Sequence, residues 1–251
     1  MNPPSAQVVD LLLEPRWLVP VEPHAVVLEE RAVAVQDGII VGIMPVAAAR
    51  LAYAPRQTVQ LPDHALIPGL VNCHTHGAMT LLRGLADDLP LQDWLQQHIW
   101  PAEARAMGAE FVRDGTELAV AEMLRGGTTC VNDMYFFSDV SGAVYQRLGL
   151  RATVGLPIID FPTVWAATQD EYFARATDVH DGFRGSALIR TAFAPHATYS
   201  VSDGAFERIG VLSDQLDIPV HLHLHETARE VEDGKATSGL RPVQRLQKRG
   251  L

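Results

Sequence analysis

Two histidines in one short segment are the residues of this sequence best suited to do chemistry. His74 and His76 stand two positions apart at the end of an apolar run, 65–71, that predicts a β-strand. Side chains alternate between the two faces of a strand, so residues two apart point the same way. Both imidazoles would then face one point beyond the carboxyl end of the strand. Two such nitrogens can bind a divalent metal.

A second histidine cluster strengthens this interpretation. The segment 218–224 predicts another apolar strand, and His221, His223 and His225 alternate with leucine there. Glu226 follows directly, so a carboxylate stands beside the imidazoles. Strand alternation puts all three histidines on one face, and spacing alone does not decide which of them would bind a metal. Imidazoles at the ends of two strands, together with an acid, are the groups of a hydrolytic metal site.

The elements that would position these groups alternate along the chain from residue 65 onwards. Strand-like runs with helical patterns between them predict βα units, in which parallel strands carry helices on the outside. The predicted strands are 65–71, 128–132, 151–159, 188–194 and 218–224. The predicted helices are 91–99, 110–124, 140–148, 169–179, 203–215 and 242–248.

Five βα units are compatible with an open doubly wound sheet or with part of a barrel, which needs eight strands. The histidines favour the barrel, because the ends of its first and fifth strands converge across the barrel mouth. In an open sheet these two ends would meet only if the strands were neighbours. We therefore predict an α/β fold in which 64–251 form a distorted (β/α)8 barrel of the TIM type, incomplete within these residues.

The first 63 residues predict a separate β-rich module. Short strand-like runs follow one another, interrupted only by a short helical pattern at 47–51, and Asp37-Gly38 between two runs is a hairpin signal. The runs are 8–13, 16–19, 25–28, 32–36 and 39–44. We interpret 1–63 as part of a small β-sandwich.

Composition argues against several classes of function. The chain has 251 residues, 47% hydrophobic side chains and a formal net charge of −10, so it lacks the basic surface that nucleic-acid-binding proteins present. No apolar run is long enough to span a bilayer, and the first residues lack a signal-peptide pattern. Cys73 and Cys130 are too few for a disulfide framework. We expect a cytoplasmic protein that binds neither nucleic acid nor membrane.

In combination, these segments resemble the amidohydrolase superfamily. The runs that carry the resemblance are PGLVNCHTH, GAMTLLRGLADDLPLQDWL, GGTTCVND, APHATYS and HLHLHETAREV. Within the superfamily they are similar to 5′-methylthioadenosine/S-adenosylhomocysteine deaminases and to the related chlorohydrolases of s-triazines. The resemblance covers nearly the whole chain. It implies a distorted (β/α)8 barrel beside a β-sandwich built from both chain ends, one divalent metal, and hydrolytic displacement at an aromatic ring carbon.

The resemblance also implies roles for single residues. His74, His76 and His223 would be metal ligands, with zinc expected and iron, nickel or manganese as alternatives. Glu226 would shuttle protons: it would donate one to a ring nitrogen of the substrate as a metal-activated hydroxide attacks, and then serve the departing ammonia. His196, at the end of the fourth strand, would face the reacting ring.

Two further residues would contact the substrate by the same resemblance. Trp94 would line the pocket, and Glu103 would accept hydrogen bonds from the ribose hydroxyls. The residues by themselves leave a plainer role open for Trp94, that of a core aromatic on an amphipathic helix. Strand alternation points Cys73 away from the barrel interior, so we interpret it as a buried packing residue. Asp133 could support the site or cap a helix.

His221 and His225 have no assigned role in this pattern. Packing is the favoured interpretation of both, although His225 could support a metal ligand from behind. The family places a further histidine on strand six and a metal-binding aspartate on strand eight, and neither lies before Leu251. We therefore expect the sequence to be the N-terminal part of a longer protein, or its remainder to lie in another chain.

Three functions follow as hypotheses. The first is metal-dependent deamination of an adenosine-type nucleoside. Here 5′-methylthioadenosine is preferred over S-adenosylhomocysteine or adenosine, because 158–170 lacks the arginines that would hold a homocysteine carboxylate. The second keeps the site but acts on a free base or s-triazine: guanine, a cytosine-like pyrimidine or a triazine. The third is a non-catalytic metal-binding fragment or subunit. By resemblance we also expect a homodimer.

Overall fold

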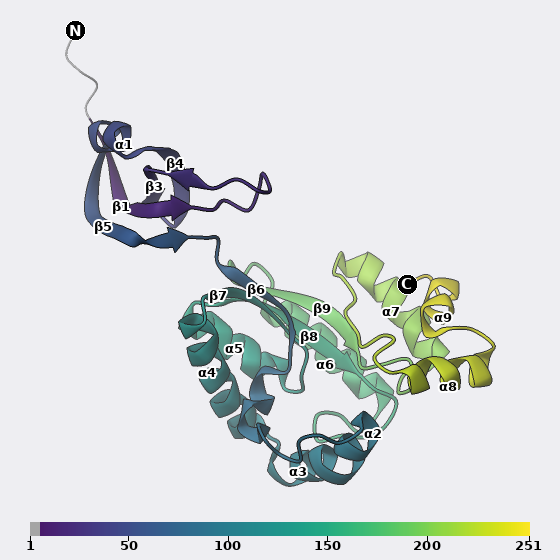
Figure 1. Cartoon of the computed structure of the whole chain (residues 1–251). Coiled ribbons are helices and arrows are strands. Elements are labelled where there is room, and N and C mark those ends of the chain that lie inside the picture. The colour runs from purple at the N-terminus through teal and green to yellow at the C-terminus, as the bar shows by residue number, and fades with distance from the viewer. Residues whose placement is uncertain (1–5) are drawn as a thin grey trace. The chain divides into compact units, whose positions relative to one another are not determined.

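The structure, a computed structural model, describes residues 6–251, which fall into two compact units (Figure 1). The first unit ends at Gly69 and the second begins at Leu70. Strand β5 (Tyr53–Leu66) runs through the expected boundary after residue 63, so the first unit extends beyond that position. Among the described residues, no helix is both long enough and apolar enough to cross a membrane.

The first unit is a five-stranded mixed sheet built around strand β1 (Gln7–Leu18), which pairs with three other strands. The remaining elements are β2 (Leu28–Glu29), β3 (Arg31–Gln36), β4 (Ile39–Pro45) and helix α1 (Val46–Ala52). The two runs expected at 8–13 and 16–19 are one strand, β1, with a register shift between Pro15 and Trp17. The run expected at 25–28 is reduced to the two residues of β2, and β5 was not predicted.

The Asp37-Gly38 hairpin is confirmed. Gln36 pairs with Ile39, and both turn residues have positive φ, 51° at Asp37 and 74° at Gly38. A two-residue loop with this geometry is a type I′ turn, whose twist matches that of the flanking strands. The turn therefore sets the register of the adjoining residues of β3 and β4, and a register shift between Ala34 and Val35 changes it farther along the pair.

The second unit contains a four-stranded parallel sheet in the order β6-β7-β8-β9 (Figure 1). The strands are β6 (Leu70–Thr75), β7 (Thr128–Asp133), β8 (Arg151–Ile158) and β9 (Ile189–Pro195). Between and after them lie η1 (Gly77–Leu82), α2 (Leu91–Trp94), η2 (Leu95–Ile99), α3 (Trp100–Ala106), α4 (Ala109–Arg125), α5 (Ser138–Leu148), α6 (Gln169–Gly182), α7 (Asp203–Leu216), α8 (Ala228–Ser238) and α9 (Pro242–Lys248).

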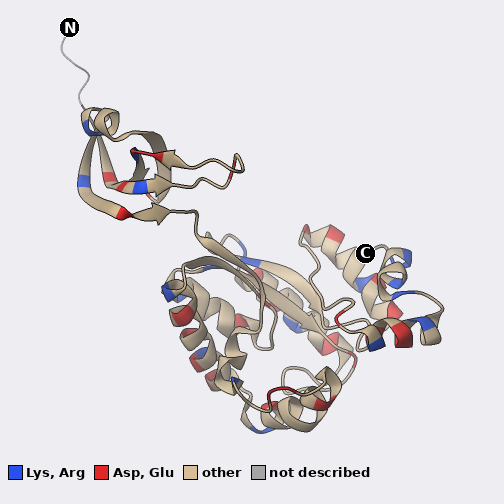
Figure 2. Ribbon diagram, viewed as in Figure 1, with Lys and Arg blue, Asp and Glu red and all other residues tan. Residues whose placement is uncertain are grey.

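Apolar burial against the sheet holds this unit together. Leu156 and Ile158 of β8 and Phe193 of β9 are fully buried, and Phe173 of α6 and Phe206 of α7 pack into the same cluster. Charged side chains lie mostly on the helices, and the strands of this sheet carry few of them (Figure 2). The sheet is thus an apolar support, and polar chemistry is confined to its ends.

Two predictions about strands were wrong. The run 65–71 is interrupted by Pro68-Gly69, so Ala65 ends β5 with Leu66, and β6 begins only at Leu70. The segment 218–224 is not a regular strand, because it joins the sheet through two isolated bridges, Phe193 to Val220 and Ala197 to His223. Helix α8 was missed, since its sequence AREVEDGKATS has too few apolar residues to show helical periodicity.

Gly115 allows α4 to pack against the turn that follows the first histidine pair. A Cβ at this position would lie 2.3 Å from the Ala78 carbonyl oxygen, a backbone atom of η1. Alanine normally stabilises an exposed helix relative to glycine by about 0.5–1 kcal/mol. Here the clash outweighs that gain, so Gly115→Ala should lower the stability by about 1–3 kcal/mol.

Thermal unfolding of Gly115→Ala beside Gly204→Ala measures this effect. Gly204 lies in α7, and a Cβ there would meet nothing within 4 Å, so that variant should unfold at or above the wild-type temperature. An unchanged or raised Tm for Gly115→Ala would contradict the close approach of α4 to η1.

Candidate active site

His76 lies just beyond β6 with its ring half-buried and its protonation fixed by a carbonyl group. Its Nδ1 contacts the carbonyl oxygen of Met134, which follows β7. A carbonyl can only accept, so Nδ1 carries the proton and Nε2 keeps its lone pair. Burial lowers the pKa of His76 to about 4, so the ring is neutral near pH 7. The Nε2 atom is therefore available as a ligand.

His223 is held in the same way from the other side. Its Nδ1 donates to the His196 carbonyl oxygen at 2.8 Å, and its Nε2 lies 3.2 Å from Nε2 of His76. Two lone pairs that face each other at this distance repel unless a cation lies between them. Two nitrogens that each lie 2.0–2.1 Å from a tetrahedral zinc are about 3.3 Å apart. The pair thus has the spacing of two ligands of one metal ion.

His74 completes a cluster of three. One nitrogen of each ring, from His74, His76 and His223, lies within 4.8 Å of the others. The His74 ring is more exposed than the other two, and its Nδ1 lies 2.8 Å from Nε2 of His221. The structure therefore brings together the three histidines expected as ligands. Three imidazoles are a donor set that suits zinc and other divalent transition metals.

The two remaining histidines of the second cluster, His221 and His225, have different contacts. His221 contacts His74, so it is more than a packing residue. His225 has a left-handed backbone, with φ of 57°, and turns away. Its Nε2 accepts a hydrogen bond from the Val243 N–H at 3.3 Å, in the first turn of α9. The expectation that strand alternation puts all three on one face is wrong at His225, because the extended backbone ends there.

Asp133 fixes the turn that follows His76. Its side chain is buried, and its two oxygens accept hydrogen bonds from the Gly77 N–H at 2.8 Å and the Tyr145 hydroxyl at 2.9 Å. Burial raises the pKa of this carboxyl to about 6. Since Gly77 is the first residue of η1, Asp133 both caps a short helix and supports the site. The two roles that the sequence left open are thus combined.

A cavity of about 340 Å³ opens beside His76 and His223. Four other residues singled out from the sequence line it: Trp94, Glu103, His196 and Glu226. Most of its remaining wall is apolar, which is typical of a pocket that binds a small organic molecule through a few directed polar groups.

Two of these residues have rings that are held in place at the cavity wall. His196 Nδ1 lies 2.9 Å from the Ser200 hydroxyl oxygen, and burial lowers the pKa of this ring to about 3, so it is neutral. Trp94 donates its indole N–H to the Leu85 carbonyl oxygen at 3.1 Å. Trp94 lines the cavity and is only partly buried, so it is not a core aromatic.

Tyr135 is a cavity residue that was missed from the sequence. Its hydroxyl donates to Glu103 Oε1 at 2.5 Å, and both side chains are buried. Burial raises the pKa of Glu103, and the hydrogen bond from Tyr135 opposes that shift. The available signal was an aromatic run directly after the strand end at Asp133.

Glu226 is exposed at the edge of the cavity, and its backbone N–H donates to Glu230 Oε2 at 2.7 Å. The interpretation of Cys73 as a buried residue is wrong. Cys73 is exposed in the described structure. Both Cys73 and Cys130 are free thiols.

Comparison with known proteins supplies the family context. Residues 65–250 match the model of the amidohydrolase family. The chain is 45% identical over 242 residues to the 5-methylthioadenosine/S-adenosylhomocysteine deaminase of Saccharophagus degradans, which covers 96% of this chain and 54% of the relative. It is 46% identical to the deaminase of the same name from Teredinibacter turnerae, over 97% of this chain and 55% of the relative.

Solved structures also match this chain. An adenosine deaminase from Xanthomonas campestris with bound zinc matches with a TM-score of 0.96 and 63% identity, over 98% of this chain and 56% of its own. An atrazine chlorohydrolase from Arthrobacter aurescens, complexed with zinc, matches at 0.85 and 18% identity, over 96% of this chain and 58% of its own, and this likeness shows the fold alone. The predicted fold class is thus confirmed, and the chain spans about half the length of the relatives it matches.

Because the Nε2 atoms of His76 and His223 face each other, we predict that the loss of either ring weakens metal binding strongly. His76→Ala should lower the affinity for Zn²⁺ by more than the roughly 10–100-fold that loss of an outer partner of a ligand costs. Competition with a chromogenic chelator measures the affinity in the full-length protein. His64→Ala, at an exposed position of the first unit, is the matched control and should bind Zn²⁺ like the wild type. Equal affinity of both variants would contradict the site.

Proposed function

This chain belongs to the amidohydrolase family, and we propose that its protein is a metal-dependent aminohydrolase that releases ammonia from an adenosine-type nucleoside. The observation that carries the proposal is the pair of Nε2 atoms, from His76 and His223, that face each other 3.2 Å apart beside a cavity lined by a carboxylate. Because the chain spans about half of its relatives, the activity is proposed for the whole protein.

We propose that His74, His76 and His223 hold a divalent metal, and that this metal is zinc. The donor set fits zinc, and the Xanthomonas relative, 63% identical, has zinc bound. Iron, nickel and manganese also accept imidazole ligands. When bound, such an ion lowers the pKa of a coordinated water to near 7 and so supplies a hydroxide nucleophile.

Glu226 is the proposed proton shuttle. Hydroxide attack on the ring carbon that bears the amino group places negative charge on the adjacent ring nitrogen. The Glu226 carboxylate at the cavity edge would take the proton that the attacking water gives up and pass it to that nitrogen. It would then take the proton of the newly added hydroxyl group and pass it to the amine, which leaves as ammonia while the carbonyl forms. His196, neutral and on the same cavity wall, is proposed to contact the reacting ring.

The cavity also supports a nucleoside over a free base. Glu103 lines it with one oxygen bonded to Tyr135, and a carboxylate has the capacity to accept further bonds from ribose hydroxyls. Phe161 and Leu91 add apolar surface, and none of the cavity-lining residues within 6–251 is a lysine or arginine. A neutral 5′ group such as methylthio fits this wall better than a homocysteine carboxylate. We therefore prefer 5′-methylthioadenosine as substrate.

The other hypotheses have less support. The likeness to the chlorohydrolase of atrazine concerns the fold alone, and a triazine or free base would leave Glu103 without a diol to bind. A non-catalytic fragment would have no use for Glu226 beside the histidines. Both cysteines are free, in keeping with the proposed cytoplasmic location. The homodimer stays a prediction.

Ammonia release from 5′-methylthioadenosine by the full-length protein tests the function. A chelator should abolish it and Zn²⁺ should restore it. Glu226→Gln should lower kcat by about 10²–10⁴-fold, because the amide cannot transfer a proton, and should keep the metal. Glu110→Gln, at an exposed position of α4, should leave kcat unchanged. Metal-loaded protein that releases no ammonia from any adenosine-type nucleoside would contradict the proposal.

A further inference from the structure

Glu230, in the first turn of α8, is a buried carboxylate with both oxygens engaged. Only 7% of the residue is exposed. Oε1 accepts a hydrogen bond from the Thr198 hydroxyl at 3.0 Å, and Oε2 accepts one from the Glu226 backbone N–H at 2.7 Å. These two bonds therefore tie two separate segments to one side chain.

The local sequence explains how Glu230 reaches both partners. Thr227 is the N-cap of α8, and its hydroxyl accepts the Glu230 N–H at 3.1 Å. In a capping box, a glutamate at this position bonds back to the N–H of the cap residue itself. Here the carboxylate bonds to Glu226, one residue earlier, and reaches across to Thr198. A common helix-start motif is thus redirected toward the loop that carries His196.

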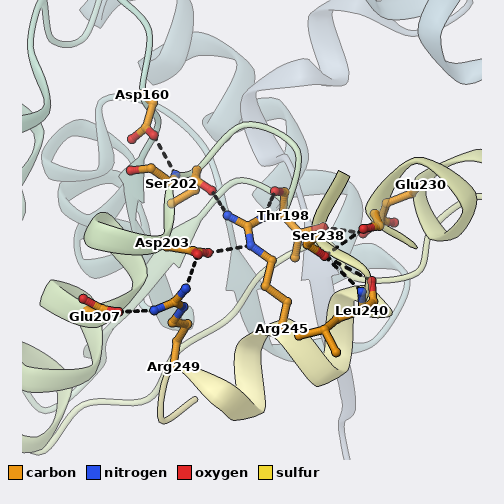
Figure 3. Close-up of polar contacts among 12 residues, drawn as sticks. Asp160, Thr198, Ser202, Asp203, Glu207, Glu230, Ser238, Leu240, Arg245 and Arg249 are labelled. Atoms are coloured by element: carbon orange, nitrogen blue, oxygen red, sulfur yellow. Dashed lines mark hydrogen bonds and ion pairs between the residues drawn. The ribbon is translucent and has the colours of Figure 1, made fainter. Parts of the chain in front are cut away.

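Helix α9 holds the same loop from a second side (Figure 3). The Arg245 guanidinium donates to the carbonyl oxygens of Thr198 and Val201, the latter at 3.0 Å, and pairs with Asp203 at 2.7 Å. Arg249, which follows the last residue of α9, also pairs with Asp203. The backbone of the loop is therefore fixed by α9. His223 also bonds to the His196 carbonyl oxygen, and Glu230 adds a second link, which is made to Glu226 itself.

We infer that Glu230 is a positioning residue, which sets Glu226 at a fixed place relative to the loop that carries His196. The inference rests on the proposed function, in which these two residues act on one substrate ring. The three histidines expected to hold the metal have other anchors, among them the carbonyl oxygens of Met134 and His196. Loss of Glu230 should therefore affect turnover and leave metal binding intact.

Steady-state kinetics of three variants of the full-length protein test this. Glu230→Ala removes both bonds, and we expect kcat for ammonia release to fall about 10–100-fold, the size typical of losing an outer support of a site. KM and bound zinc should stay near wild type. Glu230→Gln should recover most of kcat, because its amide oxygen can accept from Glu226 and its NH₂ can donate to the Thr198 hydroxyl. Glu232→Ala, exposed on the same helix, is the control.

A wild-type kcat for Glu230→Ala overturns the inference, as does a Glu230→Gln variant impaired as severely as Glu230→Ala. If Glu230→Ala does not fold, Thr198→Val is measured in its place. This substitution removes the hydrogen bond from the Thr198 hydroxyl to Glu230 with little change in side-chain volume. We expect its kcat to fall severalfold, and an unchanged kcat overturns the inference.

Hydrogen exchange separates this inference from the proposed function, since it needs no turnover. The Glu226 amide should exchange faster in Glu230→Ala than in wild type or in Glu232→Ala, and equal rates overturn the inference. If the wild-type protein releases no ammonia, but the Glu226 amide still exchanges faster in Glu230→Ala than in wild type, the proposed function is refuted. The positioning of Glu226 by Glu230 is then retained.

Discussion

Two carbonyl oxygens determine what this site can do. Those of Met134 and His196 accept from Nδ1 of His76 and His223, and so leave two Nε2 lone pairs facing each other 3.2 Å apart. This arrangement is repulsive by itself and favourable around a cation. Burial of the His76 ring adds to the constraint, because it disfavours relief of the repulsion by protonation. The two facing lone pairs thus form a site that suits a divalent metal.

The parallel sheet is what brings these carbonyls and rings together. Met134 follows β7 and His196 follows β9, while His76 follows β6, so all of them lie at the carboxyl ends of strands in one sheet. Apolar side chains of β8 and β9 are buried behind them, and Asp133 fixes the turn at Gly77. The cavity beside the rings then needs only a few polar groups to orient a substrate.

The sequence predicted the features that depend on local spacing. The His-x-His pair, the helices between the strands and the Asp37-Gly38 turn all follow from local patterns. Features set by tertiary contacts were beyond such reasoning. Strand alternation could not separate His223 from His225, because the difference is a left-handed backbone at His225. Tyr135 and Glu230 were missed because each bonds to a residue about 30 positions away, Tyr135 to Glu103 and Glu230 to Thr198. Glu230 also lies on α8, a helix without apolar periodicity.

The central claim is that one metal ion lies between Nε2 of His76 and Nε2 of His223. A crystal structure of the zinc-loaded full-length protein, with anomalous scattering recorded at the zinc edge, tests it most directly. We predict one zinc peak about 2.0–2.1 Å from both Nε2 atoms and from one nitrogen of His74, with both Nδ1 atoms still bonded to carbonyl oxygens. Zinc bound elsewhere, or bound through Nδ1 of either ring, would contradict the account.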